Sequence, residues 1–255
     1  MTDRVPSPSS ILVDVELPHP ALLSPALVEL LASLRVVLVG WYAVPEQTTP
    51  AQARDQFEAS AQATLDRVAR PFEEAGAQVD RRLVFTGDRL ETLTRISGEE
   101  DCDAVLIPGE MGALRRLLVP LRGLQNARRI APFVADLVRT DTPAQGEATE
   151  VTLLHVLGAE ETVAGTRQEV LEPMADLLAG HGVDPDRLRL ETDQAEAPGA
   201  HIVDRAADYD AVVLGETEPS VREILFGTVP EQIVEATSVP VIVVRHEQEA
   251  VEAGG

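Results

Sequence analysis

Three short segments of this chain recur after nearly the same interval. Residues 101–107 (DCDAVLI) are matched by 208–214 (DYDAVVL), and the other pairs are 11–15 with 117–121 and 83–86 with 189–192. All three pairs are offset by about 106 residues, as expected for a duplicated unit. Each match is short, so the prediction rests on the shared offset. Two copies of one fold are expected, at residues 10–113 and 114–247.

Strand-like and helix-like segments alternate in both copies. Apolar runs without polar alternation, typical of strands covered on both faces, occur at residues 36–39, 151–154, 212–214 and 241–244. Apolar residues three and four apart predict helices over about residues 53–75, 162–180 and 220–236. This alternation indicates parallel α/β sheets. The first copy lacks the last helix and strand of the second, because it runs from residues 104–107 almost directly into the next opening strand.

The charge of the chain excludes several classes of partner. Its 255 residues have a formal net charge of −22, and all 21 basic residues are arginine. Nucleic acid and anionic membranes are bound mainly through basic side chains, so neither is expected as a partner. Acidic residues spread along the whole chain favour adaptation to high salt, which screens their repulsion. With a polar N-terminus and no long apolar run, the protein is expected to be cytoplasmic, without membrane insertion.

No arrangement of residues typical of catalysis or metal binding is found in the sequence. The single cysteine, Cys102, precedes an apolar run and is predicted to be a packed thiol. The five histidines lack metal-site spacing, and His155 falls in a predicted strand, where a core role is expected. No G-x-S-x-G nucleophile elbow occurs. The sequence therefore predicts a binding or regulatory protein that is not an enzyme and holds no metal.

The sequence resembles the universal stress protein family in its tandem form over residues 11–245. The resemblance rests on LLVPLRGLQNARR (117–129), TGDRLETLTRISGEEDCDAVLIPG (86–109) and YDAVVLGETEPSVREILFGTVPEQIVEATSVPVIVVR (209–245). It implies two doubly wound parallel-sheet domains, Rossmann-like and similar to adenine nucleotide alpha hydrolases, with a role in the stress response. The first of these domains would lack its last helix and strand. LLVPLRGLQNARR and VPEQTTP (44–50) look especially like stress-protein domains attached to some amino-acid transporters, which implies a transporter or another protein as partner.

Nucleotide-binding members of the family carry the motif G-x2-G-x9-G-[ST]. Its glycines let the loop approach phosphates, and the start of the following helix cradles them. Gly215 matches the first glycine, and Gly227 with Thr228, followed by Val229, matches the closing positions. Glu218 replaces the second glycine, and the interval after it is one residue short. A side chain and a negative charge therefore stand where the resemblance places a triphosphate.

The opening strands depart from the family pattern as well. Arg122 stands where nucleotide binders have an acidic residue that contacts the nucleoside, whereas the first copy keeps Glu16 there. The first copy's GEMG loop, at 109–112, matches the spacing of the two glycines without the rest of the motif. The resemblance therefore implies a degenerate site at Gly215, Gly227, Thr228, Val229 and Arg122, with no cofactor expected.

Two further expectations concern the C-terminal part of the chain. As an alternative to a degenerate site, the loop at residues 215–228 would bind ATP or AMP as a switch, with slow ATP hydrolysis. The apolar strand at residues 240–244 is predicted to be a free sheet edge. Since unpaired apolar edges invite pairing, a homodimer through this strand is expected.

Overall fold

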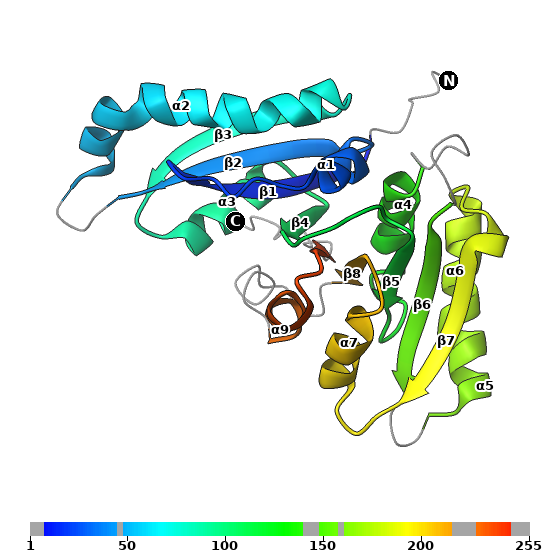
Figure 1. Cartoon of the computed structure of the whole chain (residues 1–255). Coiled ribbons are helices and arrows are strands. Elements are labelled where there is room, and N and C mark those ends of the chain that lie inside the picture. The colour runs from blue at the N-terminus through cyan, green and yellow to red at the C-terminus, as the bar shows by residue number, and fades with distance from the viewer. Residues whose placement is uncertain (1–7, 45–47, 140–147, 158–160, 216–227, 246–255) are drawn as a thin grey trace, which may run out of the picture.

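A computed structural model describes residues 8–44, 48–139, 148–157, 161–215 and 228–245, and the statements below concern these residues (Figure 1). Nine strands form a single sheet within them. The strands are β1 (Ser10–Leu17), β2 (Arg35–Ala43), β3 (Gln78–Thr86), β4 (Ala104–Ile107), β5 (Arg116–Pro120), β6 (Glu150–Leu157), β7 (Leu188–Gln194), β8 (Ala211–Gly215) and β9 (Val241–Val244). We call β1 to β4 the N-terminal half and β5 to β9 the C-terminal half, each with its helices.

The structure has helices where the spacing of apolar residues predicted them over 53–75 and 162–180. They are α1 (Pro25–Leu31), α2 (Pro50–Glu74), α3 (Arg89–Glu99), α4 (Ala127–Leu137), α5 (Val163–Thr166), α6 (Glu172–Gly180), α7 (Pro198–Ala206) and α9 (Thr228–Thr237). A π-helical turn at Arg167–Leu171 joins α5 to α6, so the predicted helix over 162–180 is continuous. A capping box between Thr49 and Gln52 starts α2. The predicted helix at 220–236 is described only from Thr228 onward.

The two halves repeat one strand order. The full order is β3-β2-β1-β4-β9-β8-β5-β6-β7, so β3-β2-β1-β4 read inward from one edge corresponds to β7-β6-β5-β8 read inward from the other. The three matched pairs of sequence segments fall on β1 and β5, β3 and β7, and β4 and β8. Every pairing is parallel except β4 with β9. The predicted α/β class is confirmed, and β4 is followed directly by β5.

The last strand is not a free edge. β9 pairs in parallel with β8 and in antiparallel with β4, where Ile107 lies opposite Val241 and Ala104 opposite Val244. The predicted homodimer through residues 240–244 is therefore wrong, because both hydrogen-bonding edges of that strand are used within the chain. The two expected sheets are joined into one, and β9 covers the edge that the shorter N-terminal half would otherwise expose (Figure 1).

We expect the chain to be monomeric in solution. The outer strands of the sheet are β3 and β7, and both carry charged residues, which discourage pairing with another sheet: Arg81 and Arg82 on β3, Arg189 and Glu191 on β7. Size-exclusion chromatography with light scattering should give the mass of one chain. A dimer mass that is independent of protein concentration would contradict this and would require an interface away from β9.

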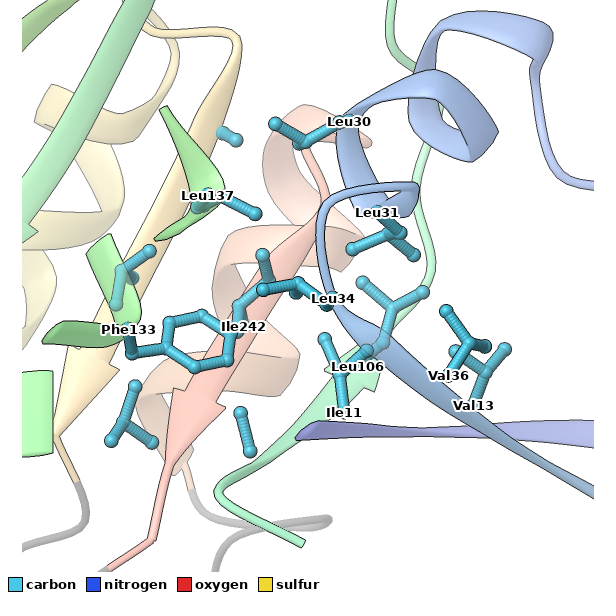
Figure 2. Close-up of a cluster of buried hydrophobic side chains, with 14 of the residues drawn as sticks. Ile11, Val13, Leu30, Leu31, Leu34, Val36, Leu106, Phe133, Leu137 and Ile242 are labelled. Atoms are coloured by element: carbon cyan, nitrogen blue, oxygen red, sulfur yellow. The ribbon is translucent and has the colours of Figure 1, made fainter. Parts of the chain in front are cut away.

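The hydrophobic core on one face of the sheet is shared by the two halves. Helices α1, α2, α4 and α6 pack on this face, while α3, α7 and α9 pack on the other. Figure 2 labels ten side chains of the shared cluster: Ile11, Val13, Leu30, Leu31, Leu34, Val36, Leu106, Phe133, Leu137 and Ile242. Phe133 of α4 and Ile242 of β9 lie among residues of α1, β1 and β4, and both are completely buried. The halves therefore have one continuous core here. None of the helices in the described ranges is long and apolar enough to cross a lipid bilayer.

Candidate functional site

Two of the predicted site residues, Gly215 and Arg122, lie at the carboxyl ends of neighbouring strands in the C-terminal half. Ligands of open α/β sheets bind at the carboxyl ends of the strands, where the strand order changes direction. In this half that point lies between the neighbouring strands β5 and β8. Gly215 ends β8, and Arg122 follows the end of β5. Thr228 and Val229 open α9, whereas Gly227, Glu218 and the loop around them lie outside the described residues.

Close packing accounts for the glycine at position 215. A Cβ added to Gly215 would lie 2.8 Å from Cδ1 of Ile130 and 3.4 Å from Nδ2 of Asn126. Both residues belong to the start of α4, so the helix lies directly against the end of β8. The glycine is therefore explained by packing without any ligand, and its role in phosphate binding stays a prediction.

The loop after β5 is basic within a strongly acidic protein. Arg122 and Arg128 are both exposed, next to the N-terminal end of α4. The side chain of Arg129 reaches the main-chain carbonyl of Arg245 at 3.4 Å. Positive side chains at a helix N-terminus suit an anion. This chemistry differs from the acidic nucleoside contact implied by the family pattern.

The glycines of the GEMG loop have different roles in the N-terminal half. A Cβ on Gly109 would lie 2.4 Å from the carbonyl oxygen of Ser238, 2.5 Å from the nitrogen of Pro240 and 2.6 Å from the carbonyl carbon of Val239. A Cβ on Gly112 would meet nothing within 4 Å. Gly109 is therefore needed where the end of β4 touches the turn before β9. The sequence offered no signal for this contact, since the two segments lie far apart along the chain.

In the N-terminal half, an arginine at the start of α3 lies over the ring of the only tryptophan in the sequence. Arg89 of α3 pairs with Asp14 of β1 at 2.6 Å, and its guanidinium lies 5.5 Å from the centroid of the Trp41 ring. Glu16, the acidic residue of the family pattern, is exposed near the end of β1. Sequence reasoning missed this cluster, because its members come from two strands and a helix.

A second polar cluster connects α7 to the edge strand β7. Asp193 accepts a hydrogen bond from Nε2 of His201 at 2.8 Å and is ion-paired with Arg205. Arg205 also binds Glu191 at 2.5 Å and the hydroxyl of Tyr209 at 3.1 Å. Burial alone would raise the pKa of Asp193, but the hydrogen bond from His201 and the charge of Arg205 outweigh it. The pKa of Asp193 therefore lies below its ordinary value.

Asp193→Asn is expected to lower the free energy of unfolding by about 1–2 kcal/mol at pH 7 and by much less near pH 3. The pKa of Asp193 is depressed in the folded state, so its contribution is complete above the unfolded-state pKa of about 3.9 and is lost as pH falls through the lower folded-state value. Urea unfolding at both pH values measures the difference. Asp176→Asn, at an exposed position on α6, is the control and should change little. If Asp193→Asn lowered the free energy of unfolding equally at the two pH values, the pKa of Asp193 would not be depressed in the folded state.

Two further groups with reactive side chains are buried. The thiol of Cys102 is fully buried, and burial raises its pKa to about 12, which confirms the predicted packed thiol. His155 is also buried, as predicted, with Nε2 3.1 Å from the carboxylate of Glu161. Within the part of the chain that is described, no three His, Cys, Asp or Glu side chains are grouped so that they could hold a metal ion.

Comparison with protein families identifies the C-terminal half. The family model described as the universal stress protein family matches residues 113–245, just over half of the chain. The chain belongs to the universal stress protein family. Its match begins one residue before the predicted second copy and ends just beyond β9. No curated protein sequence matches this universal stress protein.

Solved structures show the same fold over nearly the whole molecule. A universal stress protein from Archaeoglobus fulgidus gives a TM-score of 0.61 at 14% identity, covering 93% of this chain and 98% of that chain. A functionally unknown protein from Pseudomonas aeruginosa gives a TM-score of 0.50 at 15% identity, covering 94% and 93% of the two chains. At these identities the likeness shows the fold and nothing about ligands.

Proposed function

We propose that this universal stress protein is a regulatory binding protein built from two units, residues 10–113 and 114–247. It acts in the cytoplasm, at high salt, without catalytic turnover. The family match over residues 113–245 supports the second unit directly. The strand order β3-β2-β1-β4, which repeats β7-β6-β5-β8, supports a related first unit whose last strand is replaced by β9.

We propose that the nucleotide site of the second unit is degenerate. The observation that carries this is the close approach of Ile130 and Asn126 to Gly215, which explains the retained glycine by packing, so the glycine alone is no sign of a working site. The sequence adds Glu218, the shortened interval before Gly227, and Arg122 in place of an acidic nucleoside contact. Glu218 and the shortened interval act against a bound triphosphate, and Arg122 removes the nucleoside contact of the family pattern.

Calorimetric titration of Mg-ATP in molar KCl tests the proposal. No heat of binding is expected from protein that is folded and free of nucleotide in the same buffer. Thr228→Ala and Gly227→Asp alter the two closing positions of the motif, so neither variant should differ from the parent protein. Binding in the micromolar range that both substitutions abolish would overturn the proposal.

The second candidate function is an ATP- or AMP-binding switch that uses the loop at residues 215–228 and Val229, the residue that follows it in the sequence. It is favoured by the exposed Arg122 and Arg128, which would offset phosphate charge beside the end of β8. Arg122→Ala separates the two readings. It should weaken nucleotide binding about tenfold in a switch and change nothing in a degenerate site.

The proposed regulatory role requires a protein partner, and an amino-acid transporter is the first candidate because of the resemblance of residues 117–129. Co-purification from native membranes tests this partner, with the parent chain and the Arg122→Ala variant used as matched baits. An amino-acid transporter recovered with the parent chain would support this partner. If only soluble proteins are recovered, the partner is a different protein.

A further inference from the structure

The segment at residues 238–245, which we call the clasp, contacts the N-terminal half along its whole length. Its middle is β9, whose four residues lie opposite all four residues of β4. Ile242 and Val244 face the shared core with α1 and α4, and Val241 and Val243 face the opposite core with α3 and α7. All four side chains are at most 2% exposed. The clasp therefore fills a slot between β4 and β8 that has apolar walls on both faces.

The first end of the clasp is fitted to the loop after β4. The amide of Glu110 donates to the carbonyl of Ser238 at 2.7 Å, next to the contact that excludes a side chain at Gly109. Ser238 has φ of 57°, which is unusual for a residue with a side chain. The hydroxyl of Thr237 accepts a hydrogen bond from the amide of Val239 at 3.2 Å and supports this turn. The turn is thus shaped to meet the N-terminal half.

The second end of the clasp is a buried arginine held by the N-terminal half. Arg245 is 4% exposed, and its Nη1 donates to the carbonyls of Ser97 at 2.8 Å and Cys102 at 3.3 Å. Its amide donates to the carbonyl of Asp103 at 2.8 Å. An arginine keeps its charge under all ordinary conditions, and a buried charge is costly unless it is hydrogen-bonded. These three partners belong to α3 and the turn before β4, so the opposite half supplies both hydrogen bonds of Nη1, while the buried Nε of Arg245 has no hydrogen-bond partner among the described residues.

We infer that the clasp is a structural part of the N-terminal half, supplied by the other end of the chain, and that the two halves are stable only as one cooperative unit with the clasp docked. Release of the clasp opens the edges of β4 and β8 together and uncovers the core shown in Figure 2. The slot accepts a strand of four apolar residues followed by an arginine. A change at the C-terminal end of the chain therefore acts on β1 and β4 as strongly as on β8.

Hydrogen exchange followed by mass spectrometry on the full chain tests this inference with Arg245→Ala. Peptides that contain β1 and β4 should exchange about tenfold faster than in the parent protein, together with those that contain β9. Arg95→Ala, which removes an exposed ion pair with Glu99, is the matched control and should leave all these rates unchanged. Faster exchange in β8 and β9 with unchanged rates in β1 and β4 would overturn the inference.

Ile242→Val provides a milder change should Arg245→Ala fail to fold. It removes one methylene from the middle of β9, and exchange in β1, β4 and β9 should rise together, about threefold to tenfold. Trp41, the only tryptophan, gives an independent readout because it lies on β2, outside the clasp. Its fluorescence transition in urea should coincide with the loss of helix signal in both variants. Two separate transitions, with the tryptophan signal unaffected by either substitution, would contradict a single cooperative unit.

Discussion

Gly109→Ala is expected to lower the free energy of unfolding by about 2–4 kcal/mol. The added methyl group would lie 2.4–2.6 Å from backbone atoms of residues 238–240. Those atoms lead directly into β9, so they cannot move away without disturbing the pairing of β9 with β4 and β8. Urea unfolding followed by circular dichroism measures the loss.

Gly112→Ala is the matched control for this prediction. It adds the same methyl group three residues further along the same loop, where nothing lies within 4 Å. Neither glycine has a left-handed backbone, so strain from the substitution itself is absent in both. The control should change the free energy of unfolding by less than about 0.5 kcal/mol. Similar losses in the two variants would show that Gly109 is not closely packed against the turn.

Phe133→Ala is expected to cost about 3–5 kcal/mol, because it removes a large and completely buried ring from the shared core. Phe133 belongs to α4 of the C-terminal half but lies in the same cluster as Ile11 and Leu106 of the N-terminal half (Figure 2). The substitution should therefore lower the unfolding midpoint reported by Trp41, although the indole is in the other half.

Leu124→Ala controls for the loss of a hydrophobic side chain near α4. Leu124 is 37% exposed, so its truncation should cost less than about 1 kcal/mol. Tryptophan fluorescence and circular dichroism are recorded on the same urea series for each protein. A Phe133→Ala variant whose tryptophan transition stays at the parent midpoint would mean that the N-terminal half has its own independent core.

The local features of the fold could be predicted from the sequence. Apolar runs such as 36–39 and 151–154 indicated buried strands, and the stripe on residues 53–75 indicated α2, because each pattern reflects contacts made by neighbouring residues. The shared offset of the three segment pairs predicted the duplicated unit, because a duplication shifts every matched segment by the same number of residues. The doubly wound arrangement of these strands then followed from the family resemblance.

The pairing of β4 with β9 could not be predicted from the sequence. The apolar strand at 240–244 indicates only that its edges need partners, and a second copy of the chain satisfies that need as well as β4 does. The packing role of Gly109 could not be predicted for a related reason. A glycine after a strand usually marks a turn, and nothing nearby in the sequence indicates that the backbone of residues 238–240 approaches it.

The binding roles of the candidate site residues stay predictions. The resemblance placed Gly215 and Arg122 each at the end of a strand, and both lie at the carboxyl ends of neighbouring strands, β8 and β5. It did not reveal that Ile130 lies so close to Gly215, because that distance depends on how α4 packs against β8. The clusters around Arg89 and Asp193 were also missed, since ion pairs between strands and helices leave no regular spacing in a chain so rich in charged residues.

The pairing of β4 with β9 also sets the timing of folding during synthesis. About 130 residues separate the two strands, which a ribosome needs roughly 7–27 s to add. Throughout that interval β1, β2 and β3 can assemble on β4, but the outer side of β4 has no strand beside it. An apolar edge left open on a nascent chain is a target for aggregation and for chaperones. The N-terminal half, although made first, should therefore reach its final structure only after the last strand has left the ribosome.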